Sequence, residues 1–320
     1  MHEKLPVLII GFNRPDLFED RIKQCLELEL RIYLFVDKPS TNFNSELNEK
    51  VIEIVEKYRD LVSGINISKL PLGPRNSVIS SMRWFFRNEN KGIILEDDIE
   101  ICEEFVIFAG KCLQEYERDL SISSISASRF EHPSDIELKL EKSIFNSSWG
   151  WATWKNRWED FERSSANFPA LILFQNGSKL NFISRLYWQL IFLDTHYQRI
   201  VTWDYIWLWH NFYYSKFSVV PSRNLAINHG FGTNATHTTL ERLPTWLNRK
   251  IEKGVDCQVS THILQDFKYD NYINQRVHGV NLMNLSKHFL KRPFQYLYEI
   301  CVLKCKSGSS KVATFDEFSV

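Results

Sequence analysis

The 320-residue chain carries no net charge and lacks the motifs of several common protein classes. Its 39 Lys and Arg balance 39 Asp and Glu, so the basic excess typical of a general nucleic-acid-binding protein is missing. We therefore expect no nucleic-acid partner. A charged fraction of 24% with 14% aromatic residues excludes global disorder.

The six cysteines form no CxxC pair and show no zinc-type spacing with histidine, which favours reduced, buried thiols. The first strongly apolar run, residues 7–12, is too short to span a membrane. The basic start and small-residue cleavage site of a signal peptide are also missing. We therefore expect a cytoplasmic protein.

Apolar runs alternate with amphipathic segments over the first hundred residues. Strands are predicted at residues 7–12, 31–36, 65–70 and 92–95, with helices from Pro15 onward, at 44–59 and at 75–88. Strands separated by helices of this length need crossover connections, so the sequence predicts an α/β fold with a Rossmann-like, mostly parallel central sheet flanked by helices. Later segments are looser: a strand at 121–127, a helical stretch at 182–193, a strand near 219, and aromatic segments at 145–158 and 203–214. No internal repeat appears, which excludes a solenoid or a propeller.

The pattern predicts a catalytic domain over residues 1–245 and a helical extension over 246–320, with a loose tail from Ser307. Residues 285–311 hold six Lys or Arg against Glu299 alone, interleaved with aromatic side chains. Two interpretations stay open for this segment. It lies on an anionic membrane surface as a peripheral contact, or it packs on the domain with its charges solvated.

Polar side chains follow the predicted strands directly. Arg14 comes after the first strand, Asp37 after the second, and Glu96, Asp97 and Asp98 after the fourth. Ligands of parallel sheets bind at the carboxyl ends of the strands, so these groups form a candidate site. Consecutive acids repel one another unless a cation offsets their charge, and hard oxygen ligands suit Mg²⁺ or Mn²⁺ bridging to a diphosphate. Helix capping by Asp98 would explain one acid but not three.

Gly-rich phosphate-binding loops are missing. The chain has neither GxGxxG after its first strand nor GxxxxGK[ST] anywhere, which argues against a dinucleotide oxidoreductase and a P-loop enzyme. A diphosphate would then have to be held through a metal ion, as in nucleotide-sugar transferases.

Six segments in order carry a resemblance to a known family. "PVLIIGFNRP", "YLFVDKP" and "GIILEDDIEICEEFVIF" resemble the nucleotide-binding strands and metal motif of the glycosyltransferase A fold. "SSWGWATWKNRWEDF", "VTWDYIWLW" and "NLAINHGFGTNATHT" resemble bacterial nucleotide-diphospho-sugar transferases related to the N-acetylglucosaminyltransferase I family. The resemblance covers residues 5–240. It implies an inverting, metal-dependent glycosyltransferase that moves a sugar from a UDP-linked donor to a saccharide or lipid-linked saccharide acceptor, in surface polysaccharide synthesis.

The resemblance also implies roles for the acids at the strand ends. Arg14 and Asp37 would contact the nucleotide base and its surroundings, Glu96 and Asp97 the ribose and diphosphate region, and Asp98 the metal ion.

Further roles follow for the second half of the chain. Asp204 would be the base that activates the acceptor, although the family has two consecutive acids where this chain has Asp204 and then Tyr205. His237 would close over the metal or diphosphate, with His229 as its rival. The tryptophans of 149–158 have the spacing of core residues, but the glycine in "WGW" allows close approach to a ligand, so Trp151 is the candidate for stacking on a sugar.

Two other functions remain alternatives. One is a catalytically inactive carbohydrate-binding protein that uses the ten tryptophans. The other is a nucleotidyltransferase on the same fold, which would need a Gly-rich, Lys-bearing loop after the first strand, and "GFNRPD" is not such a loop.

Overall fold

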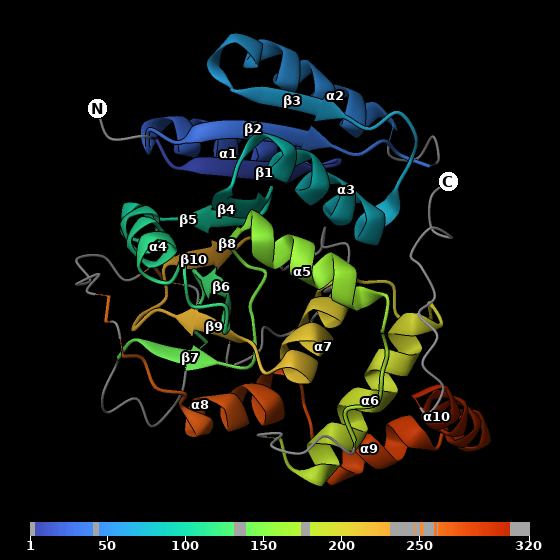
Figure 1. The fold of residues 1–320 in the computed structure, drawn as a ribbon. Coiled ribbons are helices and arrows are strands. Elements are labelled where there is room, and N and C mark those ends of the chain that lie inside the picture. Colours follow the sequence, from blue (N-terminus) through green and yellow to red (C-terminus); the bar gives the residue numbers. More distant parts are fainter. Residues whose placement is uncertain are drawn as a thin grey trace.

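The computed structural model describes residues 4–40, 45–130, 139–173, 180–230, 247, 250–251, 259–260 and 262–307. Within these residues, eight strands form one mixed sheet (Figure 1). In spatial order they are β3 (Gly64–Ile67), β2 (Arg31–Val36), β1 (Pro6–Gly11), β4 (Lys91–Glu96), β8 (Trp151–Trp154), β6 (Ile122–Ser126), β9 (Phe217–Val220) and β7 (Glu141–Ser143). Two further strands, β5 (Ile99–Ile101) and β10 (Ala226–Asn228), pair with each other.

Helices flank this sheet on both faces and extend beyond one end (Figure 1). They are α1 (Pro15–Glu27), α2 (Ser45–Lys57), α3 (Gly73–Asn88), α4 (Glu103–Glu115), α5 (Lys155–Ser165), α6 (Phe182–His196), α7 (Asp204–Tyr214), α8 (Phe267–Tyr272), α9 (Leu282–Phe289) and α10 (Pro293–Ser307). A short 3-10 helix, η2 (Arg59–Leu61), and a π-helix, η3 (Ile273–Val277), complete the elements. The predicted α/β class, with a mostly parallel and helix-flanked central sheet, is confirmed.

Pairing in the first half of the sheet is parallel throughout. β1 pairs with both β2 and β4, and β2 pairs with β3. The chain therefore extends the sheet in one direction from β1 to β3 and in the other direction to β4. In open sheets, ligands bind outside the carboxyl ends of the strands at such a switch point.

The second half departs from a purely parallel sheet. β8 lies antiparallel between β4 and β6, and β7 lies antiparallel at the edge beside β9. The aromatic segment at 145–158 thus contributes strand β8 and the start of α5. Strands of three or four residues are too short for a two-residue alternation to identify them in sequence.

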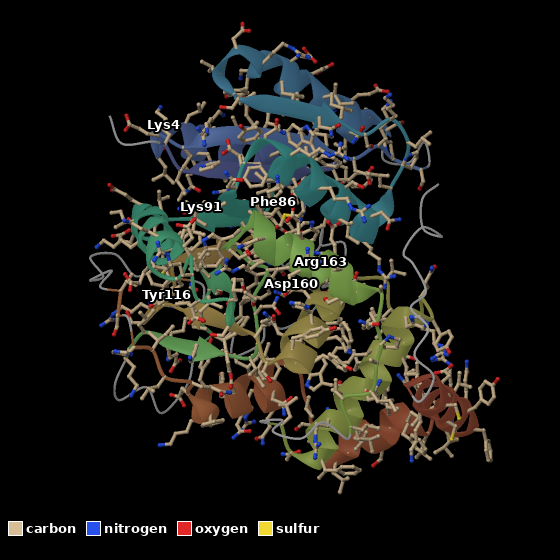
Figure 2. The ribbon with its side chains drawn as sticks, viewed as in Figure 1. Lys4, Phe86, Lys91, Tyr116, Asp160 and Arg163 are labelled. Carbon is tan, nitrogen blue, oxygen red and sulfur yellow. The ribbon has the colours of Figure 1, made fainter. Side chains whose placement is uncertain are left out.

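Alternate residues of each central strand enter different apolar layers. Val7 and Ile9 of β1 pack in one layer with α1, α2 and α4. Leu8 and Ile10 pack in the other layer, with α3, α5 and α7. Phe86 of this second layer is labelled in Figure 2. The strands are held rigidly from both sides, so their ends can position polar side chains.

Residues 262–307 pack onto this body, with α8 against β7 and both α9 and α10 against α6. The predicted domain boundary at 245/246 falls beside residues outside the described set and stays a prediction. The predicted tail lies outside that set beyond Ser307. No helix among the described residues combines the length and apolar character needed to cross a bilayer.

Candidate active site

A cavity of about 550 Å³ lies at the carboxyl ends of β1 and β4. Its volume is in the range of small-molecule sites, roughly 300–1,000 Å³. Residues from widely separated parts of the chain line it: Arg14, Pro74, Val78, Glu96, Asp98, Ser148, Trp149, 200–205, Asn228 and Gly230. The structure therefore brings together four predicted site residues, Arg14, Glu96, Asp98 and Asp204.

The acids reach the cavity because strand β4 ends there. Glu96 is the last residue of β4 and pairs with Ile10 of β1 in the ladder. The backbone N–H of Asp97 donates to the carbonyl of Ile10 at 3.1 Å. Asp97 and Asp98 consequently leave the sheet beside the end of β1, close to Arg14.

Arg14 joins the two aspartates. Its Nη1 donates to Oδ2 of Asp98 at 2.7 Å, and its Nη2 forms an ion pair with Oδ1 of Asp97. Asp97 is only 1% exposed, and its other oxygen, Oδ2, is buried without a hydrogen-bond partner among the described residues. One guanidinium thus faces a cluster of three carboxyl groups.

The pKa values of the cluster reflect this excess of acids. Burial raises the pKa of Asp97 to about 7, a larger effect than the opposing one of Arg14. Burial also raises the pKa of Glu96, and the charges of Asp98 and Asp97 raise it further. Asp204 acts on Glu96 in the same direction. The carboxyl groups of the site therefore outnumber the one guanidinium, Arg14, that contacts them.

The donor set fits a divalent cation of the kind that a diphosphate completes. Among the described residues, no three His, Cys, Asp or Glu converge as a closed metal site. Mg²⁺ is usually bound through one or two carboxylates together with substrate phosphates and water, so a closed site is not required. Asp98 on the cavity wall and the unpartnered oxygen of Asp97 are hard donors of this type.

Asp204, the first residue of α7, also lines the cavity. Its Oδ1 accepts from the backbone N–H of Tyr205 at 2.9 Å and from the hydroxyl of Thr202. Arg75 of α3 fixes the preceding loop, because Nε donates to the carbonyl of Thr202 at 3.0 Å and Nη2 to that of Thr195 at 2.8 Å. Sequence reasoning missed Arg75, whose partners lie more than a hundred residues along the chain.

The segment after β10 closes the cavity beside Asp98. The backbone N–H of His229 donates to the carbonyl of Asp98 at 2.9 Å. A Cβ on Gly230 would overlap Oδ2 of Asp98, so any larger residue at this position would force that carboxylate to move. The side chain of His229 points elsewhere, with Nε2 at 2.6 Å from Oε2 of Glu100. His237 lies outside the described residues.

Trp149, and not Trp151, lines the cavity. Trp151 is 3% exposed, stacks on Trp203 at 5.5 Å between ring centroids, and contacts Trp207 edge-on. Gly150, at φ +69°, reverses the chain between the two rings, and Ala127, Ile99 and Ile101 fill the space beside it. The expectation that Trp151 stacks on a sugar is therefore corrected: its ring is covered by core tryptophans.

Asp37 also differs from its expected place. It does not line the cavity, and its carboxylate accepts four hydrogen bonds at 2.8–3.0 Å, from Ser68 Oγ and from the backbone N–H groups of Lys38, Leu72 and Gly73. These bonds fix the start of α3 against the end of β2. The structure gives Asp37 this structural role, in place of the nucleotide contact expected from the sequence.

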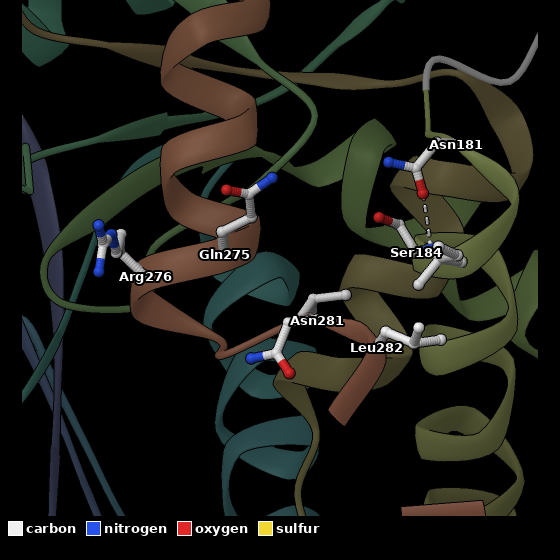
Figure 3. Close-up of a pocket in the computed structure, with 8 residues that line it drawn as sticks. Asn181, Ser184, Gln275, Arg276, Asn281 and Leu282 are labelled. Atoms are coloured by element: carbon white, nitrogen blue, oxygen red, sulfur yellow. Dashed lines mark hydrogen bonds between the residues drawn. The ribbon is translucent and has the colours of Figure 1, made fainter. Parts of the chain in front are cut away.

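A second cavity, of about 380 Å³, lies between the beginnings of α6 and α9 (Figure 3). Asn181 and Asn281, the N-cap residues of the two helices, are on its wall, and Oδ1 of Asn181 accepts from the backbone N–H of Ser184 at 2.9 Å. Its described lining contains no acid, so it offers neither a metal ligand nor a catalytic base.

The sequence matches no described protein family and no curated protein. Solved structures give partial likenesses. The structure of S. aureus TarS 1-349 is 12% identical, with 49% of each chain covered and a TM-score of 0.34. The chain thus spans about half the length of that structure. A second S. aureus TarS structure is 14% identical, with 30% of its chain covered and a TM-score of 0.35.

A mannose-1-phosphate geranyltransferase from Thermus thermophilus is 9% identical, with 70% of this chain and 76% of that chain covered and a TM-score of 0.37. Likeness at this level carries no functional argument. Membership of the N-acetylglucosaminyltransferase I family gains no support and stays a resemblance. The site is therefore interpreted from its own geometry.

Proposed function

We propose that the chain is a glycosyltransferase that moves a sugar from a nucleotide-diphospho-sugar to an acceptor hydroxyl. One observation carries this proposal: a cavity at the switch point of the sheet is lined both by Glu96 and Asp98, at and just after the end of β4, and by Asp204 at the start of α7. Acids that reach one cavity from two different elements suit a reaction in which a phosphorylated leaving group departs beside one of them and a hydroxyl is deprotonated beside the other.

The acids at and just after the end of β4 would hold the donor, which we take to be UDP-linked. A divalent ion, Mn²⁺ or Mg²⁺, supplies charge neutralisation for the leaving diphosphate when it is bound. Asp98 and Asp97 are the residues that would hold it. Arg14 keeps both aspartates in place through its two bonds; Asp98 lines the cavity, and Asp97 lies buried behind it without lining it.

Asp204 would act as the base. It is the first residue of α7, and the bonds from Tyr205 and Thr202 orient its carboxylate. The acceptor hydroxyl gives its proton to Asp204 while its oxygen bonds to the anomeric carbon, and the bond from that carbon to the diphosphate oxygen breaks. Attack from the face opposite the leaving group inverts the anomeric configuration.

The aromatic walls suit a sugar. Trp149 and Trp203 both line the cavity, and tryptophan offers a flat apolar surface with one polar atom. We propose a saccharide or lipid-linked saccharide acceptor, as in the synthesis of a surface polysaccharide.

The test is a panel of nucleotide-sugars incubated with the protein, with release of free nucleotide as the readout. We expect hydrolysis of one donor class that EDTA abolishes and Mn²⁺ or Mg²⁺ restores. Asp98→Asn should be inactive, whereas Asp60→Asn, which changes an exposed acid far from the cavity, should be unaffected.

The alternatives give different results in the same preparation. A carbohydrate-binding protein would bind glycan in titration calorimetry with no nucleotide and no metal. A nucleotidyltransferase would release pyrophosphate from a nucleoside triphosphate and a sugar phosphate. Either result, without donor hydrolysis, would contradict the proposed function.

A further inference from the structure

Helix α10 exposes an apolar face to solvent. Phe294, Leu297, Tyr298, Cys301 and Cys305 are all exposed, and they follow one another at helical spacings. This spacing places them on one side of the helix. Phe294 is 86% exposed and Tyr298 is 70% exposed. We call these five residues the outer face of α10.

The opposite side of α10 is anchored. Tyr296 is fully buried in a cluster with Leu190 and Leu193 of α6 and Leu285 of α9. Its hydroxyl donates to Oδ2 of Asp194 at 2.8 Å. The helix is thus held through its inner side, and it lies at the edge of the molecule (Figure 1).

Between residues 282 and 305, which the structure describes, the exposed charges all have one sign. Lys287, Lys291, Arg292 and Lys304 are exposed between residues 282 and 305. Glu299, the one acid in that stretch of sequence, is 3% exposed and forms an ion pair with Arg199. An apolar face that, within this described stretch, is accompanied by exposed basic groups and no exposed acid is complementary to a surface that is apolar inside and negative outside.

We propose that the outer face of α10, together with the exposed Leu290 before it, docks on a bilayer containing anionic lipid. The apolar side chains would enter the boundary between headgroups and acyl chains, while Lys287 and Lys291 meet the lipid phosphates. A second copy of this chain is a poor occupant, because its own basic groups would face those of the first. The projecting side chains of a helix at the molecular edge also suit a plane better than a partner's groove.

The docked surface is joined to the candidate active site. Arg199, which pairs with Glu299 of α10, immediately precedes Ile200 and Val201, and both of these line the cavity. Val201 is 53% exposed at its rim. A lipid-linked acceptor held in the bilayer would therefore lie near the cavity. This consequence depends on the proposed function, whereas the docking itself does not.

Sedimentation of the full chain with vesicles tests the docking. Vesicles of phosphatidylcholine alone are compared with vesicles that also contain phosphatidylglycerol. We expect binding to the anionic vesicles only, and weaker binding as salt is added. Loss of each basic contact should lower the partition coefficient about fivefold, so Lys287→Glu with Lys291→Glu should lower it by at least about 25-fold. Phe294→Ser should also lower the partition coefficient, although it leaves the net charge unchanged, because it removes an apolar side chain from the outer face.

The matched control is Lys50→Glu with Lys268→Glu, which makes the same change of charge at exposed lysines on α2 and α8. Far-UV circular dichroism confirms that each variant is folded. Equal partition of the wild-type and Lys287/Lys291 variants, or no binding to anionic vesicles, would overturn the proposal. So would a dimer that forms without lipid and dissociates with Phe294→Ser. The sedimentation assay measures vesicle binding and needs no enzymatic turnover. A negative result would therefore contradict the docking proposal without bearing on the proposed glycosyltransferase activity.

Discussion

Gly230→Ala should disturb the proposed metal site without replacing any acid. The new Cβ would overlap Oδ2 of Asp98 and lie 2.9 Å from Oδ1 of Asn228. The backbone of Gly230 is outside the left-handed region, so alanine is permitted there and the effect is confined to the added methyl group. Asp98 would have to turn away, which breaks its 2.7 Å hydrogen bond from Arg14.

The expected magnitude follows from that bond. A hydrogen bond between charged groups contributes about 1.5–3 kcal/mol to stability. Both side chains are partly screened, so we expect the free energy of unfolding to fall by about 2 kcal/mol, which for a chain of 320 residues lowers Tm by about 3 °C. Metal-dependent binding of UDP should weaken as well, because Asp98 is the proposed ligand.

Urea unfolding followed by tryptophan fluorescence measures the stability, and titration calorimetry with UDP and Mn²⁺ measures the binding. Gly110→Ala is the matched control: a Cβ there meets nothing within 4 Å, and the residue lies within helix α4. We expect this control to stabilise the protein by about 0.5–1 kcal/mol and to leave binding unchanged.

A double-mutant cycle with Asp98→Ala tests the cause. Removing the carboxylate removes the atoms that the new methyl group meets, so Gly230→Ala should cost much less in the Asp98→Ala background. Additive losses, or a Gly230→Ala protein with wild-type stability and UDP binding, would refute the reasoning.

Three further predictions concern the base, the metal and pH. Asp204→Asn should lower the transfer rate by a factor on the order of 10² to 10⁴ with little change in UDP affinity; near-normal transfer, or a product that retains the donor's anomeric configuration by NMR, would contradict the proposed base. Asp98→Asn should abolish turnover and metal-dependent UDP binding while circular dichroism stays unchanged, and full activity in EDTA would exclude the metal. His210 is 2% exposed with Nδ1 at 2.6 Å from the hydroxyl of Ser164, and burial lowers its pKa to about 4. Between pH 6.5 and 4 the imidazole therefore becomes protonated in the unfolded chain but stays neutral in the folded chain. The free energy of unfolding should fall over this range by about 3 kcal/mol because of His210, at 1.36 kcal/mol per pKa unit. His210→Asn should remove this part of the pH dependence in urea unfolding, whereas the exposed His262→Asn should not; equal slopes would contradict the prediction.

The sequence alone predicted the architecture of the first half of the chain. Apolar runs of six residues that alternate with amphipathic helices leave few arrangements, because parallel strands need crossovers and both faces of the sheet must be covered. Strands β1, β2 and β4 therefore lie close to their predicted ranges. The antiparallel strands β7 and β8 escaped prediction, since their pairing is set by partners far away in the chain.

Part of the site followed from the same logic. Acids placed directly after a buried strand must emerge at its carboxyl end, so the sequence was sufficient to place Glu96 and Asp98 beside Arg14 at one edge of the sheet. The presence of Asp204 in the same site rested on resemblance, and it required the fold to bring the start of α7 to the cavity.

Only the tertiary structure decided which polar and aromatic groups remain available to a ligand. Asp37 follows its strand as the acids of β4 do, yet backbone N–H groups at the start of α3 use its carboxylate. Trp149 and Trp151 are equivalent in sequence, but the positive φ of Gly150 sends one ring to the cavity and the other into the core. Local sequence fixes where a side chain leaves the backbone, whereas its freedom to bind depends on donors and rings that arrive from distant segments.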